Sequence, residues 1–211
     1  MKWVDFLQIV SGEPVFTSTV LMAGNVSAED IRRQLARWAR AGKIVPLRRG
    51  LYSLAPPYRK TDPHPFLVAN AMKSASYVSL QSALAFYGLI PEYTPVVTSV
   101  TTGRPEHIET GLGAFSFSHV KKSCFTGYRR VEVAPGQPVF LATPEKSLLD
   151  LVYLTPQADR MEYLRELRLQ NLEQLDIQAL MDIARSSGRP KLIRSAIRIR
   201  KLADKDQYEE L

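Results

Sequence analysis

The chain has 211 residues, with 45% hydrophobic and 23% charged residues, and these values exclude a disordered or fibrous protein. Its one cysteine, Cys124, excludes a disulfide framework and a zinc site built on paired thiolates. No uninterrupted apolar run reaches the roughly 18 residues of a membrane span, and residues 1–10 do not resemble a signal peptide. We therefore expect a globular protein of the reducing cytoplasm, without a membrane partner.

The net charge of +7 is concentrated at the start of the chain. Residues 1–60 contain ten Lys and Arg and four Asp and Glu, a net charge of +6. Residues 61–156 are neutral, and residues 157–211 carry a net charge of +1. This local excess suits an anionic partner of the first quarter of the chain.

Residues 1–56 have the element order of a winged helix-turn-helix. Apolar spacing and turn residues predict a helix over 3–10, and Thr17 or Ser18 can cap a short second helix that runs through Ala23. A third helix is expected over 27–41, with Ser27 as N-cap and Gly42 at its end. Two short strands around a basic turn, over 43–47 and 51–54, complete the order.

The third expected helix has one apolar and one basic face. At 100° per residue, an arc of about 100° holds Ile31, Leu35, Trp38 and Ala39. An arc of about 60° on the far side holds Arg33, Arg37 and Arg40. One face therefore belongs to the core, and the other is available to an anionic partner.

A helix about 22 Å long fits the major groove of B-form DNA, which is about 12 Å wide. Arg32 and Arg33, near the helix start, are the candidates for base reading, whereas Arg37 and Arg40 suit phosphates. The hairpin arginines suit a neighbouring backbone or the minor groove, and the hydroxyls and amides at the start of the second helix suit phosphate. The expected DNA-binding residues are Thr17, Ser18, Thr19, Ser27, Arg32, Arg33, Arg37, Arg40, Lys43, Arg48 and Arg49.

Two other interpretations of the basic face remain open. The arginines can form an ordinary solvated helix face, or they can meet an acidic protein. Residues 32–40 contain no acid, so we expect no ion pairing within the helix to neutralise the face, and this favours DNA.

The rest of the chain predicts a Pro-rich linker over 57–65 and a mixed α/β domain over 66–211 that ends in helices. Strands are expected over 96–102, 114–120 and 139–142, and helices over 65–73, 79–87, 143–154, 159–170, 176–186 and 190–203. The expected fold class is α+β, an N-terminal winged helix-turn-helix domain followed by this mixed domain.

Several motifs of the two regions together carry a resemblance to a known protein family. In the first region these motifs are Ile31-Arg32-Arg33-Gln34-Leu35, Gly42-Lys43-Ile44 and Arg49-Gly50-Leu51-Tyr52. In the second they are Tyr77-Val78-Ser79-Leu80-Gln81-Ser82-Ala83-Leu84, Tyr87-Gly88-Leu89-Ile90-Pro91, Val100-Thr101-Thr102 and Ala142-Thr143-Pro144-Glu145-Lys146-Ser147-Leu148-Leu149-Asp150-Leu151. These motifs are similar to those of the abortive-infection AbiE-type antitoxins, which are also described as transcriptional regulators, and the resemblance covers about residues 4–155. It implies a type IV antitoxin that represses its own operon at promoter inverted repeats, as a monomer or a dimer on the DNA, and opposes a nucleotidyltransferase-like toxin.

The remaining motifs point away from catalysis, so we expect no enzyme activity, no cofactor and no metal. Gly111-Leu112-Gly113 lacks the third glycine of a phosphate loop and predicts a hairpin turn, and His64, His107 and His119 lack metal-ligand spacing. The alternative is a Mg²⁺-dependent nuclease or phosphodiesterase that uses Glu145, Lys146 and Asp150. Against it, Glu145 and Asp150 would stand about 140° apart around a helix, which does not suit a shared metal.

Overall fold

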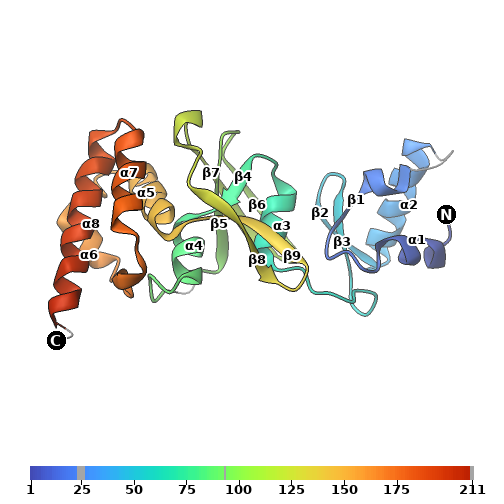
Figure 1. Ribbon diagram of the computed structural model, residues 1–211. Helices are drawn as coiled ribbons and strands as arrows, with labels where there is room; N and C mark the ends of the chain where they lie inside the picture. Colours follow the sequence, from blue (N-terminus) through green and yellow to red (C-terminus); the bar gives the residue numbers. More distant parts are fainter. Residues whose placement is uncertain (23–26, 93, 210–211) are drawn as a thin grey trace.

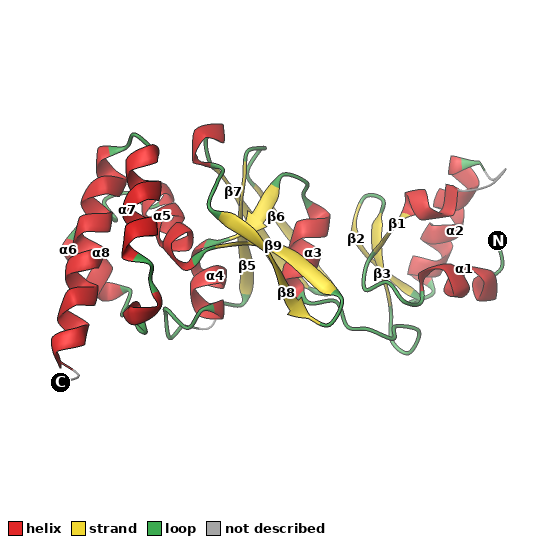
Figure 2. Ribbon diagram, viewed as in Figure 1, coloured by secondary structure: helices red, strands yellow, loops and turns green. Residues whose placement is uncertain are grey.

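The computed structural model describes residues 1–22, 27–92 and 94–209. Within these ranges the chain is mixed α+β, with eight α-helices and two β-sheets (Figures 1 and 2). An N-terminal unit, a central sheet and a group of C-terminal helices follow one another along the molecule, so the two termini lie at opposite ends (Figure 1).

The N-terminal unit contains the expected helical segments and hairpin strands in the expected order, with one further strand, β1 (Phe16–Thr17), that was not expected. The elements are α1 (Trp3–Val10), β1, the 3-10 helix η1 (Ser18–Met22), α2 (Ala28–Arg40), β2 (Ile44–Arg48) and β3 (Leu51–Leu54), with the strands in the order β1-β3-β2. The second helix is therefore a 3-10 turn, which suits so short a segment with the β-branched Thr19 and Val20. Its expected end, Ala23, lies outside the described residues.

Aromatic side chains hold this unit together. Phe6 of α1 and Trp38 of α2 have ring centroids 4.5 Å apart, and Phe6 also contacts Phe16 of β1 at 5.3 Å. Ile31 and Leu35 bury the same face of α2. Burial of aromatic side chains of this size is a major source of stability in a small unit, and it fixes which face of α2 reaches solvent.

The second sheet has six strands in the order β6-β7-β5-β4-β9-β8. They are β4 (Ser76–Val78), β5 (Val96–Thr101), β6 (Glu106–Thr110), β7 (Gly113–His119), β8 (Tyr128–Ala134) and β9 (Gln137–Ala142). β5–β7 and β4–β9 pair in parallel, and the other neighbours pair antiparallel. The turn at residues 111–112 joins β6 to β7, which confirms the expected hairpin.

Within the described residues the second unit contains six α-helices, and three of them pack on the sheet. The six helices are α3 (Pro65–Met72), α4 (Leu80–Phe86), α5 (Pro144–Leu154), α6 (Met161–Glu166), α7 (Ile177–Ser186) and α8 (Pro190–Glu209), with 3-10 turns η2 (Lys122–Cys124) and η3 (Leu172–Gln174). In Figure 1, α3 lies on the side of the sheet nearer the N-terminal unit, and α4 and α5 lie on the other side. α7 and α8 pack in turn against α5.

The three expected strands are confirmed with ends shifted by one or two residues, and three further strands were not expected. β4 is only three residues long, which is too short for a periodic signal. β6 and β8 are the two edges of the sheet, where charged and polar side chains are normal. Charged residues therefore interrupt the apolar pattern in both strands, with Glu106 and Glu109 in β6 and Arg129, Arg130 and Glu132 in β8.

The segment between the two units is tied down at both of its ends. Tyr58 packs edge-on against Trp3 of α1 with ring centroids 5.0 Å apart. Gln137 of β9 accepts a hydrogen bond from the His64 amide at 2.7 Å and donates one to the Asp62 carbonyl at 3.0 Å. Pro56 and Pro57 lie in a turn in which the Tyr58 amide donates to the Ala55 carbonyl at 2.9 Å, and Pro65 is the first residue of α3. The segment therefore contacts both units.

Candidate nucleic-acid interface

α2 presents its arginines to solvent because the opposite face is buried. Ser27 is the N-cap, and its Oγ accepts the Asp30 amide at 3.1 Å, so the helix starts where the sequence predicts. Arg32, Arg33, Arg37 and Arg40 are all exposed. The expected division into a core face and a basic face is therefore present in the structure.

The expectation that no ion pair neutralises this face is wrong. Arg33 Nη2 lies 3.0 Å from Glu29 Oε1 and 3.9 Å from Asp30 Oδ1, because both acids stand one turn before it on the exposed side of α2. The acid-free interval of residues 32–40 does not include the first turn of α2, where Glu29 and Asp30 lie. Pairs this exposed are worth little in water, so the guanidinium can exchange to another anion.

The other α2 arginines differ in how they are held. Arg37 Nη2 donates to Gln34 Oε1 at 2.8 Å. This acceptor is a neutral amide oxygen, so the hydrogen bond does not neutralise the charge of Arg37. Arg32 lies at the flank of the helix, about 100° from the buried Ile31. Arg40 lies on the face opposite Ile31. A phosphate backbone could contact Arg37 and Arg40 together, since they share one side of the helix.

η1 lies beside the β2–β3 turn. The Ser18 amide donates to the Gly50 carbonyl at 2.8 Å, and Gly50 has a φ of +81° that a side chain would strain. Thr17 and Thr19 are exposed, with their Oγ1 atoms 2.5 Å apart. The Ser18 amide is therefore used within the protein, whereas the two threonine hydroxyls face outward.

The remaining basic candidates fall into different environments. Lys43 is half-buried, with its Nζ 4.8 Å from the Trp3 ring centroid, so it supports the core of the unit. Arg49 is exposed at the turn. Arg48 is turned toward the second unit, where its Nη1 donates to the Met72 carbonyl at 3.0 Å and to Glu106 Oε2 at 3.1 Å.

Glu106 was not a candidate from the sequence, and it holds two cations. Besides Arg48, it accepts a hydrogen bond from Lys73 Nζ at 2.8 Å. The Lys73 hydrogen bond and the Arg48 charge keep the pKa of the Glu106 carboxyl below its ordinary value. No sequence signal links these residues, because 58 positions separate Arg48 from Glu106.

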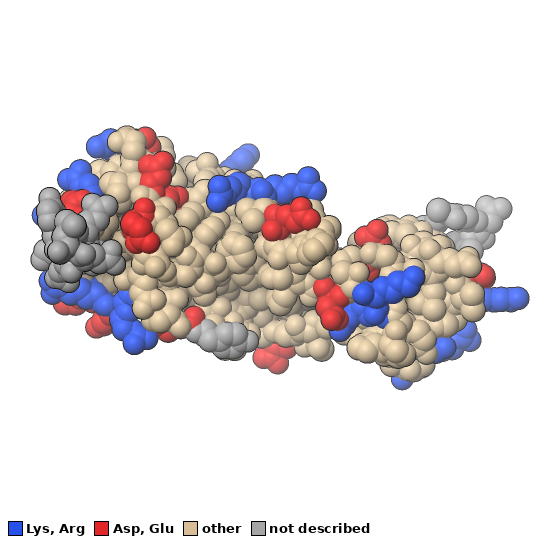
Figure 3. All heavy atoms as spheres, turned by 60° about the horizontal axis from the view of Figure 1, so that its bottom comes forward, with Lys and Arg blue, Asp and Glu red and all other residues tan. Residues whose placement is uncertain are grey.

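Acids accompany the basic side chains on the surface of the N-terminal unit. Figure 3 shows blue and red side chains together on this unit, at the right, and a largely uncharged central surface. The basic surface is thus a local feature of α2 and the hairpin turn on a mixed background.

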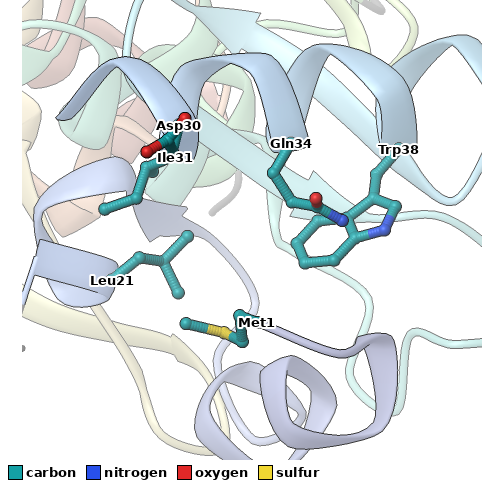
Figure 4. Close-up of a pocket in the computed structure, with 6 residues that line it drawn as sticks. All are labelled: Met1, Leu21, Asp30, Ile31, Gln34 and Trp38. Atoms are coloured by element: carbon teal, nitrogen blue, oxygen red, sulfur yellow. The ribbon is translucent and has the colours of Figure 1, made fainter. Parts of the chain in front are cut away.

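A small cavity of about 80 Å³ lies beneath the flank of α2 (Figure 4). Met1, Leu21 and Trp38 give it an apolar lining, and Asp30 and Gln34 stand on its polar side. Sites for drug-sized ligands have about 300 to 1,000 Å³. The exposed surface of α2, rather than this cavity, is therefore the candidate site of the N-terminal unit.

The three residues of the nuclease alternative, Glu145, Lys146 and Asp150, all make contacts within the protein. Lys146 and Asp150 form an almost fully buried ion pair one turn apart on α5. Asp150 Oδ2 also accepts hydrogen bonds from Ser79 Oγ at 2.8 Å and Tyr77 Oη at 3.0 Å. Glu145 Oε1 accepts the Asp176 amide at 2.9 Å, so its carboxylate points to another partner.

The environment of the pair shifts two pKa values. Burial raises the pKa of the Asp150 carboxyl, and Lys146, Ser79 and Tyr77 oppose that rise. Burial and the neighbouring Asp150 raise the pKa of the Tyr77 hydroxyl. Among the described residues, no three His, Cys, Asp or Glu side chains are grouped closely enough to hold a metal ion.

In sequence comparisons, the chain matches no model of a known protein family and no curated protein. No helix in the described part of the chain is long and apolar enough to cross a membrane.

Proposed function

We propose that residues 1–56 form a winged helix-turn-helix that binds double-stranded DNA, with α2 in the major groove. The observation that carries this proposal is that α2 exposes four arginines opposite the buried Ile31, Leu35 and Trp38. The helix of 13 residues is about 20 Å long, which suits a groove about 12 Å wide.

In this proposal the arginines divide their roles by position. Arg32 and Arg33, in the first half of α2, read base edges, and a guanine in the groove replaces Glu29 as the partner of Arg33. Arg37 and Arg40 contact phosphates, with Arg49 on the neighbouring backbone. Arg48 instead fixes the hairpin to the second unit through Glu106.

We further propose that the protein is an antitoxin and the repressor of its own toxin–antitoxin operon. The support for this biological role is the motif resemblance to AbiE-type antitoxins, together with the basic face that a repressor needs. The second unit would oppose a nucleotidyltransferase-like toxin. Inverted repeats require two copies of the N-terminal unit, one on each half-site.

DNA binding is tested by fluorescence anisotropy with the promoter fragment of the protein's own operon. Arg33→Ala is expected to weaken binding to this fragment by about 1 to 3 kcal/mol and to leave random DNA nearly unaffected, because the residue reads a base. Arg49→Ala should weaken both DNAs alike. Arg200→Ala, an exposed arginine of α8, is the matched control, and a loss equal to that of Arg33→Ala would overturn the assignment.

The antitoxin role needs a separate test. Co-expression with a nucleotidyltransferase-like protein from the neighbouring gene should restore growth if the second unit opposes that toxin. An Arg33→Ala variant should still restore growth, because α2 serves DNA alone. Growth arrest despite soluble co-expression would contradict the antitoxin role and leave DNA binding unaffected.

A further inference from the structure

A second surface, which combines exposed aromatic rings with basic side chains, lies at the edge of the six-stranded sheet. We define the β8–β9 patch as the exposed side chains Lys121, Lys122, Tyr128, Arg130 and Phe140. It lies in the second unit, on the edge strand β8, its neighbour β9 and the turn before them. Nothing in the proposed DNA interface uses it.

Two large aromatic rings remain exposed here. Phe140 is 48% exposed and Tyr128 is 36% exposed. Their centroids are 5.8 Å apart and their planes meet at 89°, so the two rings form a corner. A planar group that stacks on the face of one ring meets the edge of the other, which is a favourable arrangement for aromatic groups.

The Tyr128 ring of the corner packs on two aromatic side chains of the protein interior. Tyr128 stacks on the fully buried Tyr77 at a centroid distance of 4.5 Å and an interplanar angle of 17°, and Phe125 packs against both rings. Tyr77 is itself fixed by its hydrogen bond to Asp150. The Tyr128 ring is therefore already ordered, which reduces the entropy lost when a ligand stacks on it.

Basic residues flank the corner along the chain and in the strand ladder. Arg130 is the cross-strand partner of Phe140 in the β8–β9 ladder. Lys121 and Lys122 begin the turn that leads into Phe125, whose amide donates to the Lys122 carbonyl at 3.1 Å. No acid occurs in the sequence between Glu109 and Glu132, and the latter accepts the Gly136 amide at 2.8 Å at the hairpin turn.

We propose that the β8–β9 patch binds unpaired RNA, with one base in the corner between Phe140 and Tyr128 and the flanking phosphates on Arg130, Lys121 and Lys122. Stacking on an aromatic side chain requires a base outside a duplex, and such bases are characteristic of RNA loops and ends. Aromatic rings on neighbouring strands with adjacent cations are a known means of holding such bases on a sheet.

The test uses the full chain and a fluorescein-labelled oligouridine of about ten nucleotides. Phe140→Ala should weaken its binding about five- to hundredfold, whereas Phe140→Trp should retain binding because the stacking surface remains. Phe86→Ala is the matched control, since Phe86 is 44% exposed but packs against Phe66 and Tyr87 outside the patch. Arg130→Gln should reduce the magnitude of the salt slope by about 0.7.

Three results would overturn the proposal: no binding at low salt, equal binding by the Phe140→Ala variant, or tighter binding of single-stranded DNA of the same length. A double variant, Arg37→Ala with Arg40→Ala, separates this surface from the proposed DNA interface. It should bind the oligouridine normally and lose double-stranded DNA. A loss of both ligands would contradict the assignment of RNA to the β8–β9 patch.

Discussion

Arg48 Nη1 lies 3.1 Å from Glu106 Oε2, which joins the β2–β3 hairpin of the N-terminal unit to the edge strand β6 of the second sheet. Leu47 and Leu51, on either side of the hairpin turn, are buried in the same core as the second sheet. The orientation of the hairpin is therefore set by apolar packing and by this ionic contact together.

Replacement of this carboxylate should reveal a pH-dependent contribution to stability. Because the pKa of Glu106 is lowered in the folded protein, its contribution is fully present above the ordinary Glu pKa and is lost as the pH falls through the lowered value. Glu106→Gln should reduce the free energy of unfolding by about 0.5 to 1 kcal/mol at neutral pH, as measured by urea denaturation.

The comparison with wild type should then be repeated at decreasing pH. The difference between the two proteins should shrink below the ordinary Glu pKa. Glu173→Gln, an exposed acid of η3, is the control and should leave stability unchanged. A difference that stays constant down to acid pH would refute the ion-pair explanation.

The buried Lys146–Asp150 pair of α5 should destabilise the protein more when one charge is removed than when both are removed. Lys146→Ala leaves the Asp150 carboxylate buried without its cation and should destabilise the protein by about 3 to 5 kcal/mol. The double variant Lys146→Met with Asp150→Leu removes both charges and should be more stable than Lys146→Ala alone. Thermal unfolding measures both.

An exposed ion pair within a helix provides the comparison. Arg185→Ala removes a surface pair with Asp182 on α7 and should leave the melting temperature almost unchanged. If Lys146→Ala lowers the melting temperature no more than Arg185→Ala does, the Lys146–Asp150 pair does not stabilise the core.

Removal of the acid that holds Arg33 should strengthen DNA binding. Glu29→Gln releases the guanidinium and removes a negative charge near the phosphates, so affinity should rise severalfold, by about 0.5 to 1 kcal/mol. Anisotropy titration with the promoter fragment measures the change. Glu13→Gln, an exposed acid outside α2, should have a smaller effect, and weaker binding by Glu29→Gln would show that Glu29 positions Arg33 productively.

The local features of the fold could be predicted from the sequence. The stripe of Ile31, Leu35 and Trp38 identifies the buried face of α2, because helical periodicity needs no knowledge of the partner. Thr143-Pro144 likewise marks the start of α5, where Thr143 Oγ1 accepts the Lys146 amide at 3.2 Å.

Contacts between distant segments could not be predicted. The Arg48–Glu106 contact depends on how two units pack, and the stacking of Tyr128 on Tyr77 depends on the strand order of the sheet. The spacing of Lys146 and Asp150, one helical turn apart in an apolar helix, was a signal for their ion pair.

The most direct test of the central claim is the salt dependence of promoter binding. If about five Lys and Arg contact phosphates, log K against log salt should have a slope near −4.5 per protomer. Arg37→Ala with Arg40→Ala should reduce its magnitude by about 1.8, whereas Arg165→Ala with Arg200→Ala, exposed arginines of α6 and α8, should leave it unchanged. A slope near zero, or one that the Arg37 and Arg40 substitutions do not alter, would contradict DNA binding by α2.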